Sequence, residues 1–151
     1  RSFDDFDLHV DAIVGPGCST TQEQNVRCAA SDSSADIRVS RDPDDLVDWM
    51  AQADFAVSTA SSTTYELLAL KTPIICTPVV PNQEPIAEAL REHDAAIVLK
   101  YDDEKMDFSS AIQSYMINSS LRRQHRNTGI ELIDGQGTVR VAKKILDYIK
   151  Y

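Results

Sequence analysis

The stretch that decides the fold runs from Ala53 to Leu90 and reads ADFAVSTASSTTYELLALKTPIICTPVVPNQEPIAEAL. It contains two short apolar runs, Asp54–Ser58 and Pro73–Pro78, and each precedes a pattern typical of a helix, Thr63–Lys71 and Gln83–Glu92. This alternation is the signature of a parallel sheet covered by helices. Both runs are continuously apolar at their centres, which predicts two central strands buried on both faces.

The same alternation extends along the rest of the chain. The further predicted strands are Leu8–Val14, Asp36–Ser40 and Ala95–Leu99; the further helices are Thr20–Ala30, Asp44–Gln52, Asp107–Asp134 with a break near Asn118, and Gln136–Ile149 after a DGQG turn. Short connections and right-handed crossovers favour a single α/β domain over residues 1–151. We expect a doubly wound parallel sheet of about five strands in the order 2-1-3-4-5, with a helical C-terminal tail.

Several helix starts carry capping signals. Thr20 with Glu23, and Thr63 with Glu66, both fit the Thr-x-x-Glu capping box, in which a hydroxyl and a carboxylate satisfy free amides of the first turn. The dipeptide Asp42-Pro43 precedes the second helix and predicts a proline near its first helical position.

Composition narrows the class of protein. The 151 residues contain 15 Lys and Arg against 24 Asp and Glu, a net charge of −9. An acidic protein is unsuited to neutralising phosphate backbones, so nucleic acid is not an expected partner. No apolar run approaches the roughly 18–20 residues that span a bilayer, and the N-terminal RSFDDFDLHV does not resemble a signal peptide. We expect a cytoplasmic protein whose membrane contact is at most peripheral.

The cysteines and histidines predict neither a metal site nor a cofactor. There are three cysteines without CxxC spacing, and the three histidines lie far from them in sequence. Cys76, in the apolar run PIICTPVV, is expected to be a small buried hydrophobe. The pair Asp102-Asp103 is expected to be a solvated turn rather than the carboxylate dyad of a glycosidase.

Two loops at the carboxyl ends of strands could hold a ligand, because ligands of open parallel sheets bind there. Gly15 and Gly17 in Gly15-Pro16-Gly17 permit a close backbone approach. The segment Ser58–Thr64 has seven small residues, six of them with hydroxyls, and leads directly into a helix. Free amides and the positive end of the helix dipole make such a turn suitable for a phosphate or diphosphate. The alternative is that the hydroxyls only cap the helix.

Three polar side chains nearby have the same two interpretations. Glu66 closes a capping box or reaches the paired hydroxyls of a ribose. Asn82 and Gln83 supply amides that can both donate to and accept from sugar hydroxyls, whereas the alternative for Asn82 is an ordinary helix N-cap.

These motifs resemble the nucleotide-binding half of the family 28 glycosyltransferases. The similarity is closer to the nucleotide-sugar hydrolase of pseudaminic acid biosynthesis and to related spore-coat polysaccharide proteins, which share the "AD-apolar-S" strand, "TT-aromatic-E-L" and "NQ". It extends to VGPG (Val14–Gly17) and DGQGTVRV (Asp134–Val141). The resemblance implies the C-terminal, Rossmann-like half of a GT-B enzyme that binds a nucleotide sugar, most often a UDP-sugar, for glycosyl transfer or nucleotide-sugar hydrolysis in polysaccharide or glycoconjugate biosynthesis.

By this resemblance, each site residue acquires a role. Ser61, Ser62 and Thr63 would hold the diphosphate, Glu66 the ribose, and Asn82 and Gln83 the hexose. The backbone from Val39 to Asp42, which includes Arg41, would contact the base edge, and Gly15 and Gly17 would belong to the same site.

The sequence departs from the family in two respects. Ala60 and Ser61 stand where the family carries glycines. In addition, the family's preceding glycine-rich unit and its acceptor-binding N-terminal domain are not in these 151 residues. We therefore expect a fragment or a separately encoded subunit that works with an acceptor-binding domain, which would supply the catalytic base or nucleophile.

Two other interpretations are open. A binding or assembly module could pair with a partner through its sheet edge or its helical tail, where Arg122, Arg123, His125 and Arg126 form a basic cluster. The alternative for that cluster is a solvated helix face. A flavodoxin-like flavin or phosphoacceptor domain is disfavoured, because Gly15-Pro16-Gly17 replaces the acidic pair that a receiver domain carries after its first strand.

Overall fold

The computed structural model describes residues 6–101 and 106–149, so Asp102-Asp103 lies outside the described residues. The chain forms two compact units, one ending at Val47 and the other starting at Asp48. Each unit is described by itself.

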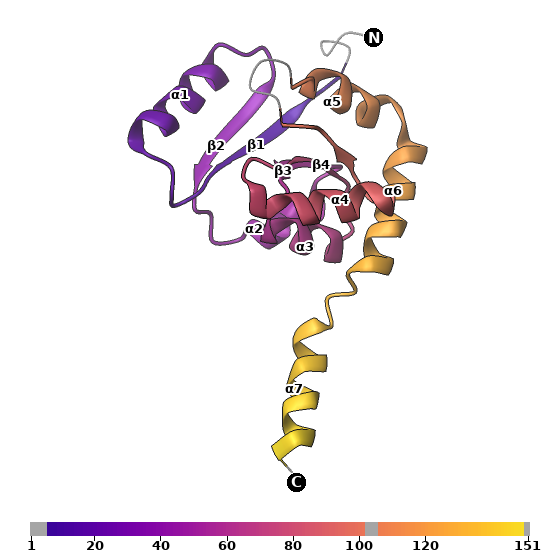
Figure 1. Ribbon diagram of the computed structural model, residues 1–151. Coiled ribbons are helices and arrows are strands. Elements are labelled where there is room, and N and C mark those ends of the chain that lie inside the picture. Colours follow the sequence, from indigo (N-terminus) through magenta and orange to yellow (C-terminus); the bar gives the residue numbers. More distant parts are fainter. Residues whose placement is uncertain (1–5, 102–105, 150–151) are drawn as a thin grey trace. The chain divides into compact units, whose positions relative to one another are not determined.

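The first unit contains two parallel strands and one helix (Figure 1). Strand β1 (His9–Val14) pairs with β2 (Asp36–Arg41), in a register that runs from His9 opposite Asp36 to Val14 opposite Arg41. Helix α1 (Thr20–Ser31) connects the strands and packs on β2. The predicted adjacency of the first two strands is thus confirmed.

The second unit is built around the stretch that opened the sequence analysis. Its elements are α2 (Leu46–Gln52, which spans the boundary between the units), β3 (Ala56–Thr59), α3 (Ser62–Ala69), β4 (Ile74–Thr77), the 3-10 turn η2 (Pro81–Gln83), α4 (Glu84–Glu92) and β5 (Ile97–Val98). The three strands are parallel in the order β3-β4-β5. The predicted neighbours 3-4 and 4-5 are confirmed.

Alternate side chains of β4 form two hydrophobic cores on opposite faces of this sheet. Ile74 and Cys76 pack with the helix α3–α4 side, whereas Ile75 packs with Tyr115 of α5 on the other side. Every residue of β4 is buried, as predicted for a central strand. Burial raises the pKa of the Cys76 thiol to about 11, so Cys76 is the inert buried residue that the sequence predicted.

The C-terminal region is entirely helical. Helices α5 (Phe108–Ile117), α6 (Ser119–Leu132) and α7 (Gly137–Ile149) follow β5. The predicted break lies at Asn118, whose side chain accepts a hydrogen bond from the amide of Leu121. Gly135, with φ of 71°, forms the turn before α7. Among the described residues, no helix is long and apolar enough to cross a membrane.

Some predicted local details were wrong. Helix α1 is capped one residue earlier than predicted: the Ser19 hydroxyl accepts from the Gln22 amide, and the Gln22 side chain accepts from the Ser19 amide. Helix α2 starts at Leu46, not near Pro43, because Asp42 takes a left-handed backbone (φ 43°) that turns the chain after β2. Strand β3 is an edge strand of its three-stranded sheet, and Val57 is 49% exposed.

Candidate functional site

The N-terminus of α3 presents free backbone amides. Strand β3 ends in Thr59, Ala60 donates its amide to Thr77 O at 3.0 Å, and α3 begins two residues later at Ser62. The amides of Ser62 and Thr63 have no acceptor among the described residues. Since these amides lie at the positive end of the helix dipole, they can receive an anion.

The hydroxyls of this turn do not satisfy those amides. Ser61 is the N-cap residue, yet its side chain makes no capping hydrogen bond. The amide of Thr64 donates instead to the backbone carbonyl of Ser61 (3.0 Å), and the buried Thr64 hydroxyl donates to Thr59 O (3.3 Å). The purely capping interpretation of this hydroxyl-rich turn is therefore wrong.

Glu66 is not part of a capping box either. With Ser62 as the first helical residue, Glu66 is the fifth, too far along the helix to reach the N-cap amide. Its side chain is exposed and makes no hydrogen bond or ion pair within the described residues. An exposed carboxylate one turn above free amides is available to a ligand.

Asn82 and Gln83 lie in the η2 turn that follows β4. Asn82 is exposed and, within residues 6–101 and 106–149, has no hydrogen-bond partner; it is not the N-cap of α4, because Gln83 occupies that position. The Gln83 carbonyl oxygen accepts from the Val79 amide (2.8 Å) and so closes the turn. Gln83 therefore stabilises the conformation of this loop, while the side-chain amide of Asn82 is exposed and available to a ligand.

The parallel pairing of β3 and β4 places these two loops at one edge of the sheet. Thr59 lies opposite Thr77 in the register, so the α3 turn and the η2 loop leave from adjacent strand ends. Sequence reasoning missed Thr77, which is 4% exposed and whose hydroxyl has no hydrogen-bond partner in the described structure. No sequence signal singles it out, because a threonine in an apolar run is ordinary for a strand.

Three predicted site residues belong to the first unit. Neither Gly15 nor Gly17 has positive φ, and a Cβ built on either meets no described atom within 4 Å, so the space beside both is open. Arg41 at the end of β2 donates to Glu23 Oε2 (2.6 Å) and to Cys18 O (2.9 Å). Its side chain thus ties the loop after β1 to β2.

The Glu23 carboxylate binds two arginines and does not cap helix α1. Its Oε1 accepts from Arg27 at 2.7 Å, and its Oε2 accepts from Arg41. The hydrogen bonds from Arg27 and Arg41 lower the pKa of the Glu23 carboxyl below its usual value. Glu23 is therefore ionised wherever the fold is intact near neutral pH.

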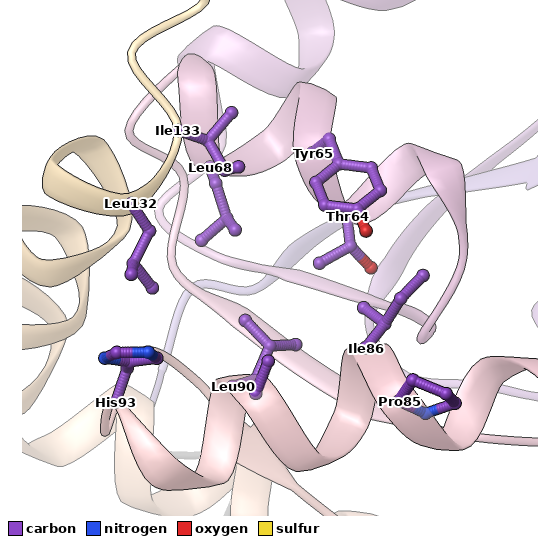
Figure 2. Close-up of a pocket in the computed structure, with 10 residues that line it drawn as sticks. Thr64, Tyr65, Leu68, Pro85, Ile86, Leu90, His93, Leu132 and Ile133 are labelled. Atoms are coloured by element: carbon purple, nitrogen blue, oxygen red, sulfur yellow. The ribbon is translucent and has the colours of Figure 1, made fainter.

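A mainly apolar pocket of about 260 Å³ lies between α3, α4 and the end of α6 (Figure 2). Leu68, Ile86 and Leu90 point into it, with Tyr65 and Thr64 at the α3 side and His93 beside Leu132. None of the nine predicted site residues lines this pocket. Thr64, the last residue of the hydroxyl-rich turn, lines the pocket, so the pocket adjoins the polar edge formed by the α3 turn and the η2 loop.

The basic cluster of the tail does not form one surface. His125 is buried, and Arg122 donates to the carbonyl oxygens of Tyr115 and Met116, where it satisfies the C-terminus of α5. Arg123 and Arg126 remain exposed. The interpretation of these four residues as a single docking face is therefore wrong.

The parallel strands and covering helices define a Rossmann-like α/β fold, which two solved structures share. MurG of Acinetobacter baumannii has this fold: it aligns with a TM-score of 0.71 at 14% identity, over 95% of this chain and 42% of MurG. The glycotransferase of kitacinnamycin aligns with a TM-score of 0.63 at 17% identity, over 93% of this chain and 43% of its own. The chain thus spans less than half the length of either protein.

At these low identities, the structural alignments show a shared fold and nothing more. No protein-family model and no curated protein matches the sequence.

Proposed function

We propose that this chain binds the donor nucleotide sugar, a UDP-sugar, for glycosyl transfer or nucleotide-sugar hydrolysis. The observation that carries the proposal is the N-terminus of α3, where the Ser62 and Thr63 amides have no acceptor in the described chain and Glu66 is exposed and unpaired. One of the two proteins that share this fold is a glycotransferase, that of kitacinnamycin, which supports the proposal.

In this proposal the amides of α3 receive the diphosphate. Negative charge grows on the diphosphate as the bond to the sugar breaks, and preorganised amides at a helix N-terminus stabilise that charge. The Glu66 carboxylate would accept hydrogen bonds from the ribose, and Asn82 would contact the hexose. The chain supplies no general base in this scheme; an acceptor-binding domain or subunit supplies it.

A thermal-shift titration tests donor binding. UDP and UDP-N-acetylglucosamine are expected to raise the melting temperature, whereas ADP and GDP at equal concentration are not. A ligand at about a hundred times its Kd stabilises a protein by about 2.7 kcal/mol. Replacing Glu66 by Gln removes a charged acceptor and is expected to weaken UDP binding by about ten- to a hundredfold.

The structure supplies a clean control for that variant. Because Glu66 makes no hydrogen bond or ion pair within the described residues, Glu66→Gln is expected to keep the melting temperature of the unliganded protein. Glu88→Gln, an equal charge change on the exposed side of α4, is expected to keep both stability and binding. No response to any uridine nucleotide, or equal loss in both variants, contradicts the proposal.

Asn82 tests the sugar end of the site separately. If its open amide contacts the hexose, Asn82→Ala is expected to weaken UDP-N-acetylglucosamine binding by about fivefold or more while leaving UDP binding unchanged. Isothermal titration of both ligands measures the difference. Equal weakening of UDP would show that Asn82 shapes the loop rather than contacts the sugar.

A further inference from the structure

The apolar pocket of the second unit adjoins the candidate donor site, and one face of α4 forms its longest wall. The residues of that face are Pro85, Ile86, Ala89, Leu90 and His93. Because they are spaced three and four apart, their side chains lie on the same side of the helix. The pocket therefore runs along α4 from its first turn to its last.

Asn82 extends this face of α4 toward the strand ends. It lies three residues before Pro85 and four before Ile86, and the backbone stays helical from η2 into α4 through Gln83 and Glu84. The exposed Asn82 side chain thus stands on the same side as the pocket wall, at the end of α4 that follows β4. A ligand that contacts Asn82 lies at the opening of the pocket.

The wall formed by α3 has the same arrangement. Thr64 and Tyr65 line the pocket, and they lie three and four residues after Ser61, the N-cap of α3. Figure 2 shows both side chains at the end of the pocket where Ile86 lies, away from His93. The polar groups at the starts of α3 and α4 therefore flank the same end of the pocket.

From this arrangement we propose that the pocket is a subsite for an acyl group longer than acetyl, carried by an amide on the hexose of the donor. The inference rests on the proposed function. An acylamido group combines an amide, which Asn82 can both donate to and accept from, with a hydrocarbon chain that the apolar walls can cover. A cavity of about 150 Å³ can hold benzene. The pocket, of about 260 Å³, has room for more than the methyl of an acetyl group.

Isothermal titration with a series of UDP-sugars tests the subsite. UDP-glucose, UDP-N-acetylglucosamine and UDP-N-butanoylglucosamine differ only in the group at one position of the hexose, and UDP alone reports on the nucleotide end. Affinity is expected to increase along the series. From N-acetyl to N-butanoyl the gain is expected to be about fourfold for each added methylene, because each becomes buried in the pocket.

A variant that fills the pocket shows where the acyl group binds. Ala89 lines the pocket from an exposed position of α4, so Ala89→Phe is expected to fill it without unfolding the protein. This variant is expected to lose the preference for N-butanoyl over N-acetyl and to keep UDP binding. Ala142→Phe, the same change at an exposed position of α7, is expected to keep both. The melting temperatures of the unliganded variants check that both are folded.

Two results would overturn the subsite while leaving the proposed function intact. One is binding of the N-butanoyl sugar that is no tighter than binding of the N-acetyl sugar by the wild-type protein. The other is a preference for the longer acyl group that survives in Ala89→Phe. A protein that binds no uridine nucleotide contradicts the proposed function, and the subsite with it.

Discussion

Tyr115 and His125 are buried polar residues of the second unit. Tyr115 is fully buried, and its hydroxyl donates to Ile74 O at 3.0 Å. The same oxygen lies 2.6 Å from His125 Nδ1, in a hydrogen bond whose donor depends on the histidine tautomer. His125 Nε2 lies 3.5 Å from Asp94 Oδ1 and makes no hydrogen bond within the described residues.

This geometry gives the protein a pH dependence of stability with a definite sign. Burial lowers the pKa of His125 below 6.5, and the nearby Asp94 carboxylate only partly opposes that effect. The unfolded state thus binds more protons than the folded state just below pH 6.5, so the free energy of unfolding is expected to fall as the pH is lowered through this range. Urea denaturation at a series of pH values between about 5 and 7 measures it.

Two histidine variants identify the group responsible. His125→Gln is expected to flatten this part of the pH profile, whereas His93→Gln, at an exposed position, is expected to keep it. His9, whose pKa is raised mainly by its hydrogen bond to Asp36, stabilises in the opposite direction but contributes equally to all three proteins. An unchanged slope in His125→Gln would assign the titration to another group.

At the scale of single elements, a helix that starts one residue earlier than predicted gives different residues the capping role. The sequence places Thr20 and Glu23 in a capping box, but the chain uses Ser19 and Gln22. The two boxes differ by one residue. The Glu23 carboxylate is engaged instead by Arg27 and by Arg41, which comes from β2, far away in sequence.

Alanine substitution distinguishes the two caps. Ser19→Ala is expected to lower the free energy of unfolding by about 1 kcal/mol, because the Gln22 amide loses its acceptor. Thr20→Ala removes only the side chain of the first helical residue and is expected to be neutral or slightly stabilising, since alanine favours the helix. Urea denaturation measures the free energy of unfolding of both variants. A larger loss in Thr20→Ala than in Ser19→Ala would show that Thr20 is the N-cap.

A shift of two residues decides the candidate site. Since α3 begins at Ser62 with Ser61 as its N-cap, the capping-box position is Thr64, and Glu66 lies two residues beyond it. The sequence left Glu66 with a capping and a ligand-binding interpretation, and the observed helix start removes the first. Asn82 likewise loses its capping interpretation because Gln83 is the residue that precedes α4.

At the scale of the whole molecule, the pattern of apolar runs predicted most of the architecture. The order of strands and helices, the parallel pairs 2-1, 3-4 and 4-5, and the full burial of β4 follow from local sequence, because β-branched runs and helical periodicity specify elements without knowledge of distant contacts. The likeness to MurG and to the glycotransferase of kitacinnamycin shows the same α/β fold.

The apolar face of α7 can be found from the sequence, but its exposure to solvent cannot. A 3.6-residue pattern predicts an apolar face and leaves open whether another element of the chain covers it. Only the packed structure shows that α3, α4, α5 and α6 contribute residues to the cores or the pocket of the second unit, while every residue of α7 is exposed.

The amino-acid sequence by itself determined which segments become strands and helices and which hydroxyls and amides stand at the strand ends, since these depend on local periodicity and residue type. Tertiary structure decided which polar groups form hydrogen bonds within the protein. Gln83 and Arg41 bond to backbone groups of neighbouring loops, and Tyr115 bonds to His125. The Ser62 amide and the Glu66 and Asn82 side chains have no hydrogen-bond partner within the described residues. The reason is that hydrogen-bond partners are chosen among groups brought close by packing, and local sequence does not encode that proximity.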